Sequence, residues 1–201
     1  MDAMTKFSYG LFVVSAKADG RDGGCIINTA MQTTVNPVQV SICVNKDNFT
    51  HDMIMESGEF NLSFLSEEVP FSVFQHFGFQ SGRDVDKFAD FADCARTDNG
   101  IMHLTKYANA VVSVKINSKV DLGTHTMFTG EVSYDKELSA VPSVTYQYYF
   151  DHIKPKPEKT DAPKKGFVCK ICGYVYEGEV LPPDFICPWC KHGVEDFEPI
   201  G

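Results

Sequence analysis

The sequence has no long apolar run. The main run near its start, residues 11–16, is interrupted by Ser15 and followed by Lys17. A membrane-spanning helix needs roughly 20 apolar residues, and a secretory signal needs a cleavage site after its apolar stretch. We therefore expect a soluble, cytoplasmic chain with no membrane partner.

Positive charge is also scarce. The chain has 18 Lys and Arg against 27 Asp and Glu, and its net charge is −9. Such a chain repels phosphate backbones, so we expect no nucleic-acid partner. The Gly-x-Gly-x-x-Gly fingerprint of dinucleotide-binding folds is missing as well. That absence leaves both a nicotinamide-using enzyme and a passive electron carrier open.

One proline-rich segment divides the chain. Residues 153–165 contain Pro155, Pro157 and Pro163 together with five lysines, a composition typical of an extended tether. Both flanks are acidic: residues 1–152 carry 11 basic and 19 acidic side chains, and residues 166–201 carry 2 and 6. We predict an N-terminal domain over 1–152, a linker over 153–165 and a small domain over 166–201.

The first domain is rich in short β-branched and aromatic runs bounded by Gly, Asn and Asp, which predict strands. These runs cover residues 7–16, 24–29, 37–45, 59–65, 108–120, 126–134 and 144–150. Two short helices are predicted, one capped by Thr50 and ended by Gly58, the other over residues 70–77. Many strands and few helices indicate a mainly β fold, most simply a barrel.

Four of the seven cysteines form two Cys-x-x-Cys pairs near the end of the chain: Cys169, Cys172, Cys187 and Cys190. Two such turns can place four thiolates tetrahedrally around one iron or zinc ion. A domain below roughly 40 residues usually needs a metal or disulfides to fold. The spacing therefore predicts a metal centre, and a zinc ribbon is one form that it can take.

The residues around these pairs favour iron. Gly173-Tyr174 follows the first pair, Pro188 lies within the second, and an aromatic set surrounds both: Tyr174, Tyr176, Phe185, Trp189 and Phe197. The module resembles rubredoxin in these features, and its short central stretch resembles the compact rubredoxin modules fused to other redox proteins. A four-thiolate iron has no open coordination position, so we expect it to pass single electrons and not to catalyse chemistry itself.

A second polar group of residues precedes and opens the first predicted helix: Asn45, Lys46, Asn48, Thr50 and His51. Free N–H groups and a cation at a helix N-terminus favour a phosphate. An ordinary capped helix explains the same residues without a ligand.

Residues 1–152 resemble the flavin reductase family with its FMN-binding split barrel. The matching stretches are residues 28–32, 45–51, 77–88, 123–131 and 145–146. The entire chain resembles the high-molecular-weight rubredoxins of anaerobes. This resemblance implies a mainly β chain, with a split β-barrel and short helices plus a small rubredoxin-like metal-knuckle domain. It also implies a homodimer that takes electrons from NADH or NADPH through FMN to iron.

The resemblance also implies roles for individual residues. The isoalloxazine and ribityl chain would be lined by Asn28, Thr29, Ala30, Met31 and Gln32. The phosphate would be held by Asn45, Lys46, Asn48, Thr50 and His51. Cys43 would lie beside the ring, His125 near its reactive face, and Arg83 and Lys87 near its pyrimidine end, the phosphate or the nucleotide.

Simpler interpretations exist for several of these residues. His125 follows Gly123 at a predicted strand start and is explained as a turn histidine, and Cys43 as a small buried side chain. Arg83 and Lys87 are explained as solvated charges. We assign Cys25 and Cys94 to packing.

We therefore predict an NAD(P)H-dependent oxidoreductase that passes electrons from FMN to iron and on to a flavodiiron protein or a rubrerythrin-like acceptor. Two other functions remain open. One is a passive carrier reduced by a separate reductase. The other is a flavin or ferric reductase whose tail is a zinc-binding docking module.

Overall fold

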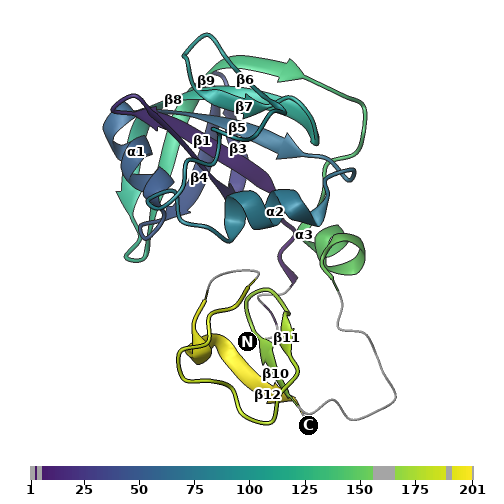
Figure 1. The fold of residues 1–201 in the computed structure, drawn as a ribbon. Helices are drawn as coiled ribbons and strands as arrows, with labels where there is room; N and C mark the ends of the chain where they lie inside the picture. The colour runs from purple at the N-terminus through teal and green to yellow at the C-terminus, as the bar shows by residue number, and fades with distance from the viewer. Residues whose placement is uncertain (1–2, 4–5, 156–165, 189–191, 201) are drawn as a thin grey trace. The chain divides into compact units, whose positions relative to one another are not determined.

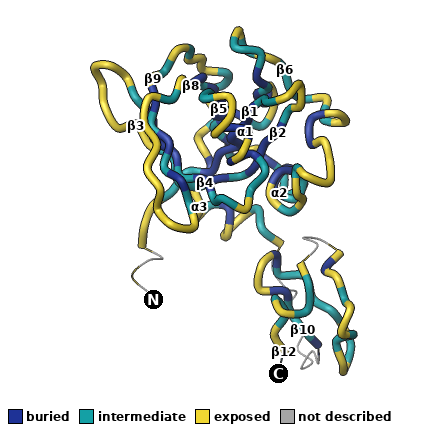
Figure 2. Tube along the Cα trace, turned by 90° about the vertical axis from the view of Figure 1, so that its left-hand side faces the viewer, coloured by how far each residue is buried: buried dark blue, intermediate teal, exposed yellow. Residues whose placement is uncertain are grey.

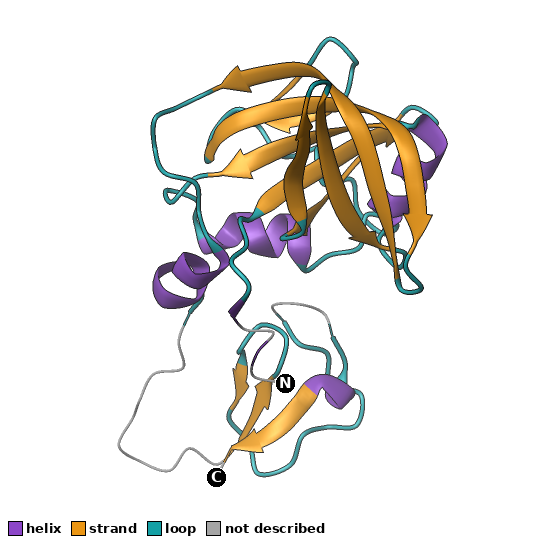
Figure 3. Ribbon diagram, turned by 180° about the vertical axis from the view of Figure 1, so that it is seen from behind, coloured by secondary structure: helices purple, strands orange, loops and turns teal. Residues whose placement is uncertain are grey.

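Seven antiparallel strands form one curved sheet in the first part of the chain (Figures 1 and 3). The structure is a computed structural model that describes residues 3, 6–155, 166–188 and 192–200. The sheet has the order β2-β1-β5-β8-β9-β4-β3. Its strands are β1 (Phe12–Ala18), β2 (Arg21–Ile27), β3 (Ala30–Val35), β4 (Val38–Asn45), β5 (Glu59–Leu65), β8 (Ala108–Asp121) and β9 (His125–Glu137).

The sheet curls into a split barrel and buries side chains on both of its faces (Figure 3). Successive strand residues point to opposite faces, so Val14 belongs to the inner core and its neighbour Val13 to the outer one. The inner core also holds Phe60 and Phe128, and the outer core holds Phe77. This double burial explains why five successive residues of β1 are buried.

Two helices and a hairpin cover the sheet. Helix α1 (Phe49–Ser57) adds Met53 and Ile54 to the inner core, whereas α2 (Phe71–Gly78) packs on the outer core. The hairpin of β6 (Cys94–Arg96) and β7 (Met102–Leu104) is pinned to the sheet by the buried Asn61, whose amide donates to the Ile101 carbonyl at 2.9 Å. Figure 2 shows the contrast with β3, whose residues after Ala30 are exposed.

Contacts divide the chain into two units, Met1–Ile153 and Lys154–Gly201. In the second unit, β10 (Gly166–Cys169) pairs with β11 (Val175–Tyr176) on one side and β12 (Phe197–Ile200) on the other. A 3₁₀ turn, Val194–Asp196, precedes β12. Most of the predicted linker, residues 156–165, lies outside the described residues. Within the described part, no helix is both long and apolar enough to cross a membrane.

One predicted strand is wrong. Residues 144–150 form an isolated bridge at Thr145, then α3 (Tyr146–Tyr148) and a π-helical turn, Tyr149–Ile153. Thr145 caps this turn, because its hydroxyl accepts the Tyr148 N–H at 3.0 Å. The Tyr146 and Phe150 rings, four residues apart, then meet at 4.9 Å between centroids. The aromatic residues that suggested a strand therefore stabilise helical turns.

Other differences are smaller. The first strand begins at Phe12 and not at residue 7, and β3, β6 and β7 were not predicted. The cap of α1 is Asn48 and not Thr50. Thr50 is the second residue of the helix and is buried, so it lies within the first turn and not at the cap.

Candidate functional sites

Three cysteine thiols converge in the second unit. Cys169 ends β10, Cys172 follows one turn later, and Cys187 comes from the distant loop. Their sulfur atoms all lie within 4.8 Å of one another, and those of Cys172 and Cys187 are 3.4 Å apart. All three residues are buried. Cys190, the fourth predicted ligand, lies outside the described residues.

The first cysteine pair is shaped by its backbone. The Gly173 N–H donates to the Cys169 carbonyl, and the Cys169 N–H donates to the Tyr174 carbonyl, both at 2.8 Å. Gly173 has φ +82°, a conformation that side chains oppose, so glycine is needed here. The turn thereby directs both thiols to the same point, as a metal site requires.

Aromatic side chains support this centre. Phe185 stacks on Tyr174 at 6.3 Å and meets Tyr176 edge-on at 4.7 Å and Phe197 edge-on at 5.5 Å. Trp189, the remaining member of the predicted aromatic set, lies outside the described residues. Converging buried thiols fit an iron or zinc ion, because thiolates are preferred ligands of both.

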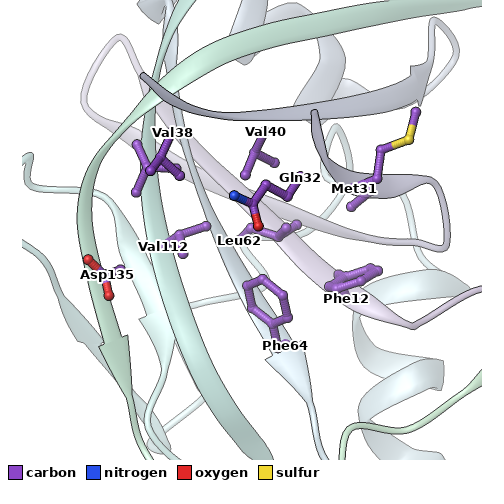
Figure 4. A pocket seen from close by; sticks show the side chains of 11 residues that line it. Phe12, Met31, Gln32, Val38, Val40, Leu62, Phe64, Val112 and Asp135 are labelled. Atoms are coloured by element: carbon purple, nitrogen blue, oxygen red, sulfur yellow. The ribbon is translucent and has the colours of Figure 1, made fainter. Parts of the chain in front are cut away.

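The first unit contains a pocket of about 390 Å³ lined by residues of β1, β3, β4, β5, β8 and β9 (Figure 4). Asp135 is its one charged lining residue among those described. The predicted residues Ala30, Met31 and Gln32 line it from β3, where Met31 is largely exposed. None of the other lining residues was predicted as a site residue from the sequence: Phe12, Val38, Val40, Leu62, Phe64, Val112, Val132 and Asp135. Strand alternation places their apolar side chains inside, but the sequence does not show which strands meet.

A polar cluster lies where β4 ends and α1 begins. Lys46 forms a 2.7 Å ion pair with Asp121 at the end of β8, and its N–H donates to the Thr124 carbonyl at 3.0 Å. Asn45 pairs with His125 across β4 and β9. The hydrogen bond from Lys46 holds the pKa of Asp121 below its ordinary value, and the Gly123 N–H adds to this effect.

His51 and Thr50 belong to the same end of the barrel but face inward. His51 is buried, with Nε2 2.8 Å from the Thr126 hydroxyl and Nδ1 3.2 Å from the Asp52 carboxylate. Arg83 reaches the other oxygen of Asp52 at 2.7 Å. Thr50 is buried as well, and the role of both residues as phosphate ligands stays a prediction.

Other predicted residues lie on the outer face of the sheet. On β4, the buried Ile42 and Val44 face the inner core, so Cys43 and Asn45 face outward. Cys43 lies opposite Met127 of β9, and its N–H donates to the Thr29 carbonyl at 3.0 Å. Asn28 and Thr29 form the turn from β2 into β3. Ala30, Met31 and Gln32 therefore lie around the pocket, whereas Cys43 and Asn45 lie on the outer face.

Asn48 and the basic residues of the segment after α2 occupy different environments. Asn48 makes no side-chain capping bond to α1. The Arg83 guanidinium lies over the Phe49 ring, 5.2 Å from its centroid. Lys87 is not a solvated charge, because it is buried and its ammonium donates to the carbonyls of Gly24 and Phe77 at 3.0 and 2.8 Å. Its contact with the flavin or the nucleotide stays a prediction.

Comparison with known proteins matches both units. Residues 4–155 match the flavin reductase like domain family, and residues 167–198 match the rubrerythrin, rubredoxin-like domain family. The chain is 32% identical to the high molecular weight rubredoxin of Moorella thermoacetica, over 98% of both chains.

Two further similarities concern mainly the first unit. The chain is 37% identical to the ferric-chelate reductase (NAD(P)H) of Archaeoglobus fulgidus, over 80% of this chain and 94% of that relative. It also resembles the solved structure of the Streptomyces globisporus C-1027 NADH:FAD oxidoreductase SgcE6, with a TM-score of 0.65 and 25% identity. That match covers 71% of this chain and 83% of the other.

Proposed function

The chain belongs to the flavin reductase-like family and carries a C-terminal rubredoxin-like domain, as the high-molecular-weight rubredoxins do, and we propose that it is an NAD(P)H-dependent oxidoreductase. In this proposal, electrons pass from a bound FMN to an iron centre in the tail. The main support for this proposal is that one chain contains both domains and aligns with the Moorella thermoacetica high molecular weight rubredoxin over 98% of both chains.

The residues of the first unit divide the work of holding the flavin. Lys46 supplies a positive charge for the phosphate, since an ammonium is a natural phosphate partner. Ala30 and Gln32 line a mostly apolar pocket. Asn45 and His125, which lie opposite each other on β4 and β9, offer polar groups on the outer face of the sheet.

In the second unit, Cys169, Cys172, Cys187 and Cys190 would hold the iron. A bound flavin accepts a hydride and a four-thiolate iron exchanges single electrons, so the pair converts a two-electron donor into one-electron steps. The three described thiols are buried, which limits contact between the centre and solvent. Thiols stay reduced and free to bind a metal in a reducing compartment, so we place the protein in the cytoplasm.

We also propose a homodimer that delivers electrons to a flavodiiron protein or a rubrerythrin-like acceptor. The charge of the tail favours a partner with a basic docking surface, because residues 166–201 carry 6 acidic and 2 basic side chains. Complementary charge accelerates such encounters and makes them sensitive to salt.

An anaerobic absorbance titration with NADH and then NADPH tests the proposal. We expect flavin and ferric-thiolate bands to bleach together. Both bands present but unchanged would indicate a passive carrier that needs another reductase. Flavin bleaching without any iron band would indicate a zinc-binding docking tail.

A second candidate activity is direct reduction of ferric chelates by the flavin unit, which the 37% identity to a ferric-chelate reductase favours. The Cys169→Ala variant separates the two. Direct reduction predicts that this variant retains the full rate with a ferric chelate. Transfer through the tail predicts that the rate is lost.

A further inference from the structure

We propose that Asp121 is a built-in competitor of the flavin phosphate at Lys46. Its carboxylate neutralises the ammonium that the phosphate needs, and so weakens phosphate binding. This inference rests on the proposed function, because it assumes that Lys46 binds the FMN phosphate. It adds a residue on β8, far from Lys46 in sequence, that limits flavin affinity.

The carboxylate is held in place by its own turn. One oxygen of Asp121 accepts two hydrogen bonds, one from the Lys46 ammonium at 2.7 Å and one from the Gly123 N–H at 2.8 Å. Gly123 has φ +83°, which glycine adopts without strain. An anionic oxygen that accepts from one ammonium and one backbone N–H makes the kind of contacts that a phosphate oxygen makes.

The lysine is fixed from the other side. Its backbone N–H donates to the Thr124 carbonyl at 3.0 Å, and the preceding Asn45 pairs with His125. The end of β4 and the turn between β8 and β9 therefore form one connected structure. Lys46 and Asp121 meet because the fold brings them together, although both side chains also reach solvent.

Two other basic side chains at this end of the barrel already have an acidic partner. Arg83 is engaged with Asp52 at 2.7 Å, and the same carboxylate accepts from His51. Removing the charge of Asp121 would therefore leave the Lys46 ammonium without its partner carboxylate. Because the pair is partly exposed, solvent screens it, and we expect a modest effect of about two- to fivefold on affinity.

Equilibrium titration of the flavin-free full chain with FMN and with riboflavin, followed by flavin fluorescence, tests this inference. Riboflavin lacks the phosphate, so it reports any effect on the ring site alone. Asp121→Asn keeps the acceptor for the Gly123 N–H but removes the charge. Asp98→Asn, at an exposed position on the β6–β7 hairpin, is the matched control.

We expect Asp121→Asn to lower the Kd for FMN about two- to fivefold and to leave that for riboflavin unchanged. Asp98→Asn should change neither. In a Lys46→Ala background, Asp121→Asn should have no effect. If Lys46→Ala weakens FMN binding while Asp121→Asn weakens it or leaves it unchanged, Asp121 is not a competitor. If Lys46→Ala itself leaves FMN binding unchanged, the proposed phosphate site fails and the inference fails with it.

Discussion

Cys25 lies on β2 inside the barrel, and its surroundings make its thiol unreactive. Burial raises the pKa of this thiol from 9.0 to about 11, although Lys87 and a hydrogen bond with Thr50 oppose the rise. A thiol with this pKa has about a hundredfold less thiolate at neutral pH than an ordinary one, and thiolate is the reactive form.

We predict that Cys25 escapes alkylation in the native protein. Native protein is treated with iodoacetamide at pH 8 and its peptides are analysed by mass. Cys25 should stay unmodified while the protein remains folded. In urea, the same residue should react at the rate of a free cysteine. Rapid native labelling of Cys25 would contradict this assignment to packing.

Asp52 links the acid stability of the protein to α1. Burial alone would raise its pKa, but hydrogen bonds from Arg83 and His51 outweigh burial and hold the pKa below its ordinary 3.8. The folded state thus binds this proton less tightly than the unfolded state. Its stabilisation is present above pH 3.8 and is lost as pH falls through the lower folded value.

We therefore predict that Asp52→Asn lowers Tm at pH 7 and that the difference from the wild type vanishes in acid. The side chain is half exposed, so the effect should stay below about 1 kcal/mol. Thermal melts of both proteins between pH 2.5 and 7 give the measurement. A difference that stays constant down to pH 2.5 would show that charge is not its cause.

At the scale of elements, one close approach fixes the pairing of β8 with β9. A Cβ at Gly130 would lie within 2.4 Å of the Lys115 carbonyl oxygen, which belongs to backbone and cannot rotate away. Gly58, the C-cap of α1, differs, because nothing lies near its missing Cβ and only its φ of +70° favours glycine.

We predict that Gly130→Ala destabilises the protein by about 2–3 kcal/mol, as overpacking does. The matched Gly58→Ala should cost only about 1 kcal/mol, from backbone strain. Urea unfolding of the two variants compares them directly. Equal losses would mean that β8 and β9 can separate locally at little cost.

The sequence predicted elements well where local patterns decide them. β4 and β5 were predicted to within one residue of their ends or better, because their apolar side chains alternate or run continuously. β3 was missed because its residues are mostly Thr, Gln and exposed apolar side chains. β6 and β7 were missed because three-residue strands depend on distant partners such as Asn61.

The candidate sites follow the same rule. Cysteine spacing predicted the three described thiols that meet, since short loops fix their geometry. The burial of Lys87 could not be predicted from the sequence, because only tertiary structure shows that its ammonium donates to the carbonyls of Gly24 and Phe77. Asp121 could not be assigned to Lys46 from sequence, since 75 positions separate them.

At the scale of the whole molecule, the two units depend on different forces. The first has two apolar cores, whereas the second is small and brings three buried thiols together, so we expect metal ligation to stabilise it. We predict that Cys169→Ala removes iron and the order of the tail but leaves FMN affinity and the unfolding of the barrel unchanged.

Iron analysis and calorimetry of the full chain test this prediction. Cys94→Ala is the matched control, because Cys94 is a partly buried thiol of the first unit. It should retain the iron. Loss of the barrel transition in Cys169→Ala would show that the units do not unfold independently.

The pairing of β4 with β9 sets the order in which the protein can form during translation. Asn45 leaves the ribosome long before its partner His125, and residues 46–124 must be synthesised between them. At about 5–20 residues per second, this interval is on the order of ten seconds. Throughout it, the β3–β4 hairpin has no neighbour from β9. The barrel can close only after β9 emerges, and the cysteines of the tail emerge later still.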